Sequence, residues 1–146
     1  MKVIQAVTDS EISACYPVLK ILRPHLEESD FLAKVRRQET EGYHLAFIRE
    51  QEAVASVAGF RIQEFLAWGK VLYVDDLITD PKMRGRGFAG SLLDWLIAHA
   101  RVMGCDEVHL DSGYQRLDAH RLYLNKGLSL NCHHFSLKFP LPSKPR

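Results

Sequence analysis

The sequence predicts an α/β fold, of the α+β kind with a mixed β-sheet. Segments in which apolar residues recur at helical spacing alternate with segments rich in β-branched and aromatic residues. Three of the strand-like segments follow one another without a helix between them, as in an antiparallel meander. We expect a single domain, residues 1–146.

The first part of the chain is expected to form one strand and two helices. Residues 2–6 are a short strand candidate. The stretch 8–11, TDSE, has the pattern of a capping box, so a helix is expected to begin there and to continue until Pro24 stops it. A second helix is predicted from residue 29 to residue 40.

The rest of the chain predicts the meander and two further helix–strand units. Strand-like periodicity covers residues 43–49, 53–62 and 71–79. The clearest helix follows, with an apolar stripe formed by Phe88, Leu92, Leu93, Leu96 and Ala100. A strand at 108–111, a helix at 117–126 and a final strand at 128–139 complete the predicted order β-α-α-β-β-β-α-β-α-β.

The charge balance argues against nucleic acid or a membrane as a partner. The chain has 19 basic and 18 acidic residues, a formal net charge of +1, and therefore no global field that would attract a polyanion. Its first residues lack the apolar core of a signal peptide, and no stretch approaches the roughly 20 apolar residues that span a bilayer. We therefore expect a cytoplasmic protein.

The cysteines predict no metal site. The three cysteines are far apart and form no C-x-x-C pair, which favours reduced structural thiols. Residues 132–134, CHH, fall in a predicted strand, where neighbouring side chains point to opposite faces. No metal is expected to be required.

Residues 84–90, RGRGFAG, are the most distinctive stretch. The glycines spell G-x-G-x-x-G, which binds a dinucleotide when it opens a βαβ unit. Here the stretch follows a meander, and the chain left after it is too short for the rest of a Rossmann fold. A glycine-containing turn at a helix start still offers main-chain amides to phosphate oxygens, and Arg84 and Arg86 add positive charge. The stretch therefore predicts a pyrophosphate site without a Rossmann sheet.

Two motifs, in this order, resemble the GNAT superfamily of N-acetyltransferases. The pattern R-x-x-G-x-A at Arg84, Gly87 and Ala89 resembles motif A, which binds the pyrophosphate of coenzyme A in that family. Residues 119–128, AHRLYLNKGL, resemble motif B, with the pattern Ala-x-x-Leu-Tyr-x-x-x-Gly. The resemblance covers the whole order of elements and implies a GNAT-like acyltransferase fold with acetyl-coenzyme A (acetyl-CoA) as co-substrate.

The resemblance also implies the cofactor site. The pyrophosphate would be held by Arg84, Gly85, Arg86, Gly87, Phe88 and Ala89, and the pantetheine arm by the main chain of Leu77, Ile78 and Thr79. Tyr123 matches the family tyrosine that protonates the departing thiolate, and a phenol is protonated at neutral pH. Arg116 stands where many members have an Asn that contacts coenzyme A; its role is left open between a phosphate and an acidic acceptor.

The general base is sought at two neighbouring carboxylates. Asp75 and Asp76 are consecutive on a predicted strand, so at most one of them should face the acceptor. Asp76 is favoured as the base; Asp75, a chain of water molecules or a purely binding role for the carboxylate are the alternatives. The acceptor groove is expected from residues 22–43 and 64–69, whose side chains include Arg23, His25, Glu27, Glu28, Asp30 and Trp68.

These residues together describe an N-acetyltransferase. It would transfer the acetyl group of acetyl-CoA to a primary amine, on a small molecule or a protein, by direct attack. The alternative is a sensor that binds acyl-CoA without turnover. The sequence does not name the amine acceptor and leaves the oligomeric state open, with a homodimer as one assembly.

Overall fold

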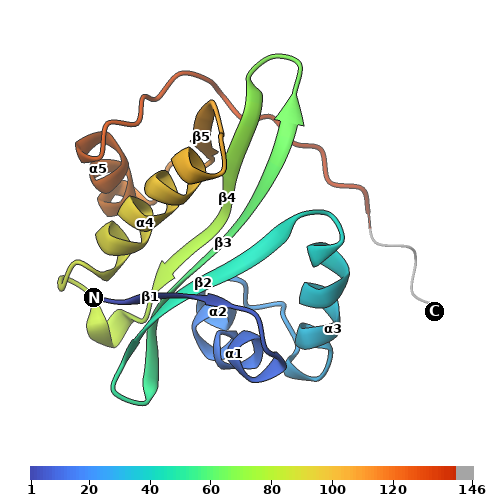
Figure 1. Ribbon diagram of the computed structural model, residues 1–146, viewed down its shortest axis with the longest axis vertical. Helices are drawn as coiled ribbons and strands as arrows, with labels where there is room; N and C mark the ends of the chain where they lie inside the picture. The colour runs from blue at the N-terminus through green and yellow to red at the C-terminus, as the bar shows by residue number, and fades with distance from the viewer. Residues whose placement is uncertain (141–146) are drawn as a thin grey trace.

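The computed structural model, which describes residues 1–140, is a mixed sheet with helices on both faces (Figure 1). Its strands are β1 (Val3–Ala6), β2 (Tyr43–Glu50), β3 (Ala53–Phe65), β4 (Gly69–Thr79) and β5 (Glu107–Leu110). They lie side by side in chain order, β1 to β4 antiparallel and β4 parallel to β5. The predicted α/β class and mixed sheet are confirmed.

The helices divide between the two faces of the sheet. On one face lie α1 (Asp9–Ala14), α2 (Tyr16–Leu22) and α3 (Glu28–Glu39); on the other lie α4 (Phe88–Val102) and α5 (Leu117–Asn125), with a 3₁₀ turn at Pro81–Met83 before α4. The capping box forms as expected, with Glu11 N to Thr8 Oγ1 at 3.1 Å. The single helix predicted up to Pro24 is wrong: Pro17, which lacks an amide hydrogen, lies in the first turn of a separate helix that begins at Tyr16.

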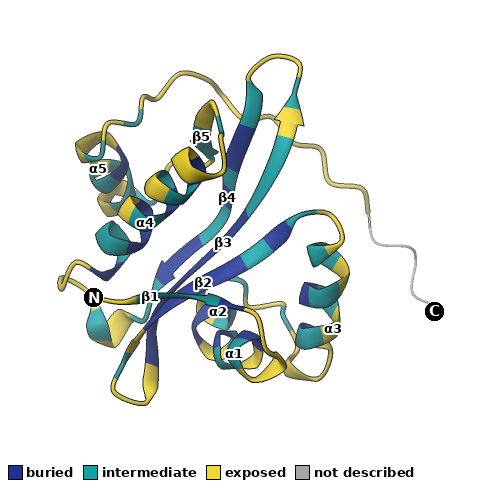
Figure 2. Cartoon of the chain, in the orientation of Figure 1, coloured by how far each residue is buried: buried dark blue, intermediate teal, exposed yellow. Residues whose placement is uncertain are grey.

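Two apolar cores hold these layers together. The predicted stripe of α4 is buried against the sheet and α5, and the side chains of α1 to α3 form a second core on the opposite face. Figure 2 shows the buried residues concentrated along β2, β3 and β4 and on the sheet-facing sides of the helices. The central strands are apolar on both faces because both faces are covered.

The final strand predicted at 128–139 is wrong. Residues 128–140 belong to no strand, and from residue 129 onward they are exposed. Alternation of apolar residues produces a strand only where a neighbouring strand supplies hydrogen bonds. The neighbour on that side is β5, which has only four residues and, among the described residues, pairs with β4 alone. After α5 the chain crosses behind the sheet (Figure 1).

An irregularity in β4 changes the direction of its two aspartates. Gly59 of β3 pairs with Asp76, and the next residue, Phe60, pairs with Val74, so Asp75 is an extra residue without a partner. Such a β-bulge shifts the alternation of side chains along a strand. Asp75 and Asp76 therefore line the same cavity, and the expectation that they face opposite sides of the sheet is wrong.

Candidate active site

The strands β4 and β5 separate partway along β4. Their pairing ends at Val74 and Leu110, although β4 continues to Thr79. Beyond that point β4 pairs with β3 alone among the described residues, through Leu77, Ile78 and Thr79. The free edge of β4 thus exposes main-chain groups to an opening between the strands. Arg116, at the start of α5, reaches into it and donates a 3.4 Å hydrogen bond to the Leu77 carbonyl.

The turn before α4 presents main-chain amides to solvent. Gly85 and Gly87 have φ values of 77° and 83°, in the left-handed region that favours glycine. Gly87 is the N-cap of α4 and makes no side-chain cap, so the first amides of the helix have no such partner. Residues 84–87 are all exposed. This arrangement suits an anion at the positive end of the helix.

The side chain of Arg86 is held away from this turn. It forms an ion pair with Glu50 at the end of β2, and its guanidinium lies over the Phe88 ring, 5.2 Å from the centroid. The Phe88 side chain itself belongs to the core between α4 and the sheet. At the turn before α4, Arg86 therefore offers an anion its main chain and not its side chain. The side chain of Arg84 is exposed beside the turn.

Tyr123 lies on α5 beside the opening. Its side chain is 8% exposed and belongs to the same apolar core as Leu77 and Phe88. Burial raises the pKa of the Tyr123 phenol, and the nearby charge of Arg116 offsets this only in part. Tyr123 thus keeps its proton at neutral pH.

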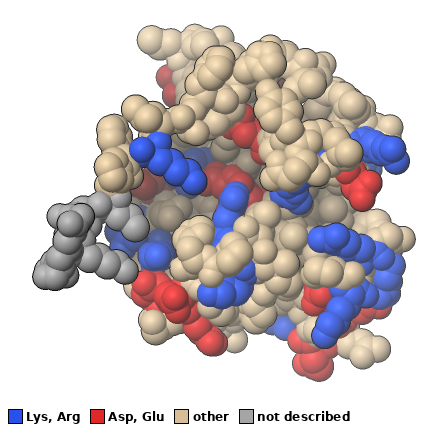
Figure 3. Space-filling model, turned by 180° about the vertical axis from the view of Figure 1, so that it is seen from behind, with Lys and Arg blue, Asp and Glu red and all other residues tan. Residues whose placement is uncertain are grey.

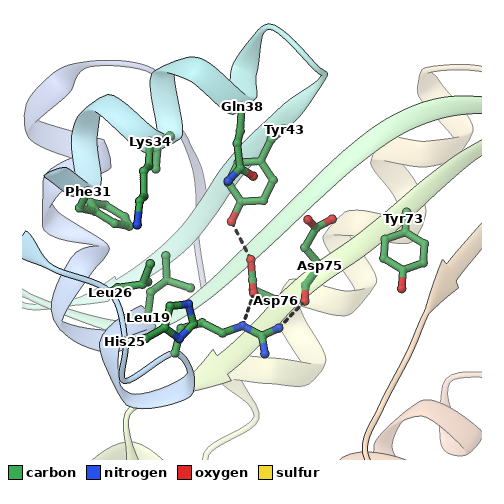
Figure 4. Close-up of a pocket in the computed structure, with 12 residues that line it drawn as sticks. Leu19, His25, Leu26, Phe31, Lys34, Gln38, Tyr43, Tyr73, Asp75 and Asp76 are labelled. Carbon is green, nitrogen blue, oxygen red and sulfur yellow. Dashed lines mark hydrogen bonds and ion pairs between the residues drawn. The ribbon is translucent and has the colours of Figure 1, made fainter. Parts of the chain in front are cut away.

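Asp76 is held by two donors from different elements (Figure 4). Arg23 Nε donates to Oδ1 at 2.9 Å, and the Tyr43 hydroxyl donates to Oδ2 at 2.7 Å. Burial raises the pKa of Tyr43 well above its usual value, and the charge of Asp76 raises it further. Tyr43 therefore stays a donor. Each carboxylate oxygen has a second lone pair, so Asp76 can still accept a proton or a hydrogen bond.

Asp75 has its own arginine partner. Arg61 donates from Nε and Nη2 to this carboxylate, the shortest distance being 2.6 Å to Oδ2. The hydrogen bond to Asp75 raises the pKa of Arg61, so the guanidinium stays charged at all ordinary pH values. Arg23 also donates to the main-chain carbonyl of Asp75 at 3.0 Å. The carboxylates of Asp75 and Asp76, both largely buried, can therefore lie next to each other because each is paired with a guanidinium.

These carboxylates lie at one end of a cavity of about 460 Å³ between the sheet and the helices α2 and α3. Tyr43 and Tyr73 add hydroxyl groups to the polar end. The remaining wall combines four apolar side chains, Leu19, Leu26, Phe31 and Val35, with four polar or charged ones, Arg23, His25, Lys34 and Gln38. On the face opposite to that of Figure 1, acidic and basic side chains lie side by side near the middle of the molecule (Figure 3).

Of the side chains expected to build an acceptor groove, only some line this cavity. Arg23 and His25 line the cavity, whereas Glu27, Glu28 and Asp30 do not. The loop 64–69 also lies elsewhere, since Trp68 packs on His109 with 4.3 Å between ring centroids. The sequence analysis did not predict that Tyr43 and Arg61 hold the two aspartates. One feature of the sequence could have indicated this contact. Gly59 is an isolated glycine inside a buried strand, and such a glycine often marks a bulge or a close approach of another group.

Residues 1–140 contain no helix long and apolar enough to cross a bilayer. They also contain no group of three or more His, Cys, Asp or Glu side chains arranged to hold a metal ion. Cys132 is exposed, and His133 and His134 contact Tyr114 and Asp111 individually.

Comparisons with known proteins agree with this geometry. The Acetyltransferase (GNAT) family matches residues 6–128. The chain is 32% identical over 123 residues to "Uncharacterized N-acetyltransferase YhdJ" of Bacillus subtilis (strain 168), covering 84% of this chain and 87% of the relative. Glucosamine-6-phosphate N-acetyltransferase from Arabidopsis thaliana superposes with a TM-score of 0.78 at 20% identity, over 95% of this chain and 98% of that one. Aminoglycoside N-acetyltransferase AAC(6')-Iy, in complex with CoA, gives 0.82 at 14% identity, over 96% and 95%.

The fold and the relatives identify an acyltransferase. At identities of 14% and 20% the two solved structures show the fold alone, but the family match covers most of the chain. The chain belongs to the GNAT family of acetyltransferases. Its relatives support acetyl transfer as the general activity.

Proposed function

We propose that the protein transfers the acetyl group of acetyl-CoA to a primary amine. The observation that carries this proposal is the opening between β4 and β5, with the exposed glycine turn before α4 and Tyr123 of α5 close to it. A thioester cofactor with a long pantetheine arm and a pyrophosphate needs these three features together: a free strand edge, an anion site and a proton donor.

The cofactor would lie along the free edge of β4. The pantetheine amides would pair with the main chain of Leu77, Ile78 and Thr79, in the way that an added strand pairs with a sheet edge. The pyrophosphate would sit at the start of α4, on the amides of residues 85–89, with the charge of Arg84 beside it. Arg116 would supply a further cationic contact in the opening.

The chemistry would be direct attack by the amine on the thioester carbonyl. The nitrogen–carbon bond forms, the carbon–sulfur bond breaks, and the thiolate takes the proton of Tyr123, which solvent then restores. Asp76 would accept the proton that the amine loses, directly or through water. Its hydrogen-bond partners, the Arg23 guanidinium and the Tyr43 hydroxyl, keep the carboxylate in place before the acceptor arrives.

The acceptor would occupy the cavity beside the two aspartates. A volume of about 460 Å³ falls in the range of roughly 300–1,000 Å³ that is typical for small-molecule sites. Its apolar wall formed by Leu19, Phe31 and Val35 suits an aliphatic or aromatic body, and its polar end suits the amine. This supports a small molecule as the acceptor in preference to a protein chain.

The first experiment measures binding of acetyl-CoA by calorimetry. Gly87→Glu places a negative side chain at the anion site and should lower the affinity at least 10-fold. Gly104→Glu is the matched control. Gly104 follows the C-terminal end of α4, has a φ of 74°, and has open space where a side chain would begin. Both variants bear a similar cost of about 1–2 kcal/mol for a left-handed non-glycine residue.

The outcomes separate binding from catalysis. Equal affinities of the two variants, or no binding by the wild type, would contradict the cofactor site. A wild type that binds acetyl-CoA but releases no thiol with any amine of a broad panel would contradict the catalytic part and favour the sensor.

A further inference from the structure

The helix α3 presents two kinds of side chain to the cavity beside the aspartates. Phe31, Lys34, Val35 and Gln38 line that cavity, and their spacing of three and four residues places them on one face of the helix. Phe31 and Val35 are buried apolar residues. Lys34 and Gln38 carry nitrogen donors, and Figure 4 shows both side chains reaching from the helix toward the cavity. An acceptor that is apolar apart from its amine has no use for either donor.

The ammonium group of Lys34 is only weakly engaged. Within residues 1–140, the one carboxylate in salt-bridge range is that of Asp30, one turn earlier on α3, with 3.8 Å between Nζ and Oδ2. This distance is longer than a hydrogen bond. The two side chains are 37% and 52% exposed, and exposed pairs of this kind contribute little to stability. Lys34 can therefore turn to an anion in the cavity at small cost.

The side-chain amide of Gln38 has its orientation set by Arg61. A guanidinium can only donate, so the 3.1 Å hydrogen bond from Arg61 Nη2 ends on the carbonyl oxygen of Gln38. The same guanidinium nitrogen is held by Asp75 at 2.6 Å. The amide nitrogen of Gln38 is thus directed away from Arg61, with two hydrogens to donate. Lys34 and Gln38 together offer a charged and a neutral donor to one ligand group.

The charges at the cavity favour an acceptor that carries a negative group. The charged side chains that line the cavity or pair with its carboxylates are three basic ones, Arg23, Lys34 and Arg61, and two acidic ones, Asp75 and Asp76. Each carboxylate already has a guanidinium partner. A diamine would therefore bring a second positive charge to a site with a surplus of basic groups, whereas an anionic group would complement that surplus.

Resting on the proposed acetyl transfer to an amine, we propose that the acceptor also carries a carboxylate, which Lys34 and Gln38 bind while the amine lies at Asp76. The two oxygens of a carboxylate can accept from an ammonium and from an amide together, and the charged donor strengthens the contact. Phe31 and Val35, on the same face of α3, would contact the carbon chain of the acceptor. The substrate class is therefore the amino carboxylates.

The test compares kcat/KM for amino carboxylates with kcat/KM for other amines of the same length. The series runs from glycine to 6-aminohexanoate, each compound being compared with the alkylamine and the diamine that have the same number of carbon atoms. Release of thiol from acetyl-CoA measures the rate. The wild type should prefer an amino carboxylate over its alkylamine about 10-fold or more, which is the effect of one hydrogen bond to a charged group. The diamines should be the poorest acceptors.

Variants of Lys34 test whether this residue causes the preference. Lys34→Gln should remove most of the preference, and Lys34→Glu should reverse it in favour of the diamine. The matched control is Arg37→Gln, which removes a positive charge from the same helix at an exposed position outside the cavity and should keep the wild-type ratio. A partial loss of folded protein lowers both rates equally and leaves their ratio unchanged. A wild type without the preference, or a Lys34→Gln enzyme that retains it, overturns the proposal.

Failure of the proposed acetyl transfer has a different signature. If no amine of the series releases thiol, calorimetry in the presence of CoA measures binding of the same compounds. Amino carboxylates that bind the wild type about 10-fold more tightly than Lys34→Gln would support the carboxylate site in a protein that does not transfer acetyl groups. Equal binding to both proteins, or none, would overturn the carboxylate site as well. Turnover of the alkylamines and amino carboxylates at equal rates would overturn the carboxylate site alone.

Discussion

The Tyr43 hydroxyl donates a 2.7 Å hydrogen bond to Oδ2 of Asp76, and it does so across the position of Gly59. Gly59 is the cross-strand partner of Asp76 at the bulge in β4. A Cβ atom at residue 59 would overlap the hydroxyl and lie 2.6 Å from the carboxylate oxygen. Three strands thus meet in one contact that exists because one residue has no side chain.

Removing the hydroxyl should impair use of the acceptor. In Tyr43→Phe, Asp76 loses one of its two donors, and a hydrogen bond to a charged group contributes about 1.5–3 kcal/mol. We expect kcat/KM for the amine to fall about 10-fold or more, with the Kd of acetyl-CoA unchanged. Thiol release measures the first quantity and calorimetry the second.

The control for this change is Tyr16→Phe. The Tyr16 hydroxyl also donates a half-buried hydrogen bond, to the Leu26 carbonyl at 3.0 Å, but it does not touch Asp76. An equal loss of activity in both variants would show that general destabilisation, and not the position of Asp76, is responsible.

Gly59→Ala should lower the stability of the fold. The added methyl group displaces Tyr43 and Asp76 in a packed site, and overpacking of this kind costs about 1–3 kcal/mol. Gly90→Ala should change the free energy of unfolding in the opposite direction. A Cβ atom at residue 90 would meet Lys126 and Leu122 at 3.6–3.8 Å, which is ordinary contact. Because Gly90 lies within α4, alanine should stabilise that helix by up to about 1 kcal/mol.

Denaturant unfolding of the two glycine variants checks both signs. A Gly59→Ala protein as stable as the wild type would mean that Tyr43 and Asp76 can separate without cost. The close approach at this glycine would then have no energetic importance.

Local patterns in the sequence predicted those parts of the fold that depend on local geometry. The capping box at Thr8 and the apolar stripe of α4 depend on spacing within one element, and both are confirmed. The glycine turn before α4 was found in the same way, and Gly85 and Gly87 have the left-handed angles it needs. What these features share is that each can be read without knowing which segments become neighbours.

The errors concern pairing between strands. Strict alternation placed Asp75 and Asp76 on opposite faces, but a bulge, which depends on the register with β3, brings them to one cavity. Likewise, alternation at 128–139 predicted a strand, but these residues pair with no strand of the described chain. Tyr43 and Arg61 were missed because their importance comes only from lying next to these aspartates in space.

Tyr123→Phe should reduce turnover without loss of cofactor binding. The phenyl ring keeps the apolar contacts of the buried side chain, while the proton for the thiolate is lost. General acid catalysis contributes about 10²–10⁴-fold, so kcat should fall within that range. Since burial raises the pKa of Tyr123, the wild type should show no loss of activity from its ionisation between neutral pH and about 10.

Single-turnover measurements over this pH range test the assignment. Leu122→Ala, at the neighbouring position on α5, is the control for altered packing. A Tyr123→Phe enzyme with wild-type kcat would exclude the phenol as the acid.

His99 should make the stability fall in mild acid. Its ring stacks on Trp95, 4.8 Å between centroids, and meets Phe60 edge-on at 5.6 Å. Burial there lowers the pKa of His99, and the charge of His44 lowers it further. The unfolded chain therefore takes up a proton at higher pH than the folded chain does. The contribution of neutral His99 to the free energy of unfolding is therefore fully present above the ordinary histidine pKa of about 6.5. It decreases as the pH falls below that value.

The measurement is the free energy of unfolding at pH 7.5 and pH 5.5 for the wild type and His99→Phe. Phenylalanine keeps the aromatic stack but does not titrate, so the variant should lose less stability than the wild type between these two pH values. His25→Gln, which replaces an exposed imidazole, is the control for the loss of a histidine elsewhere in the chain. If His99→Phe and the wild type lose the same stability on acidification, protonation of His99 does not oppose folding, and its burial has no effect on the pH range in which the protein is stable.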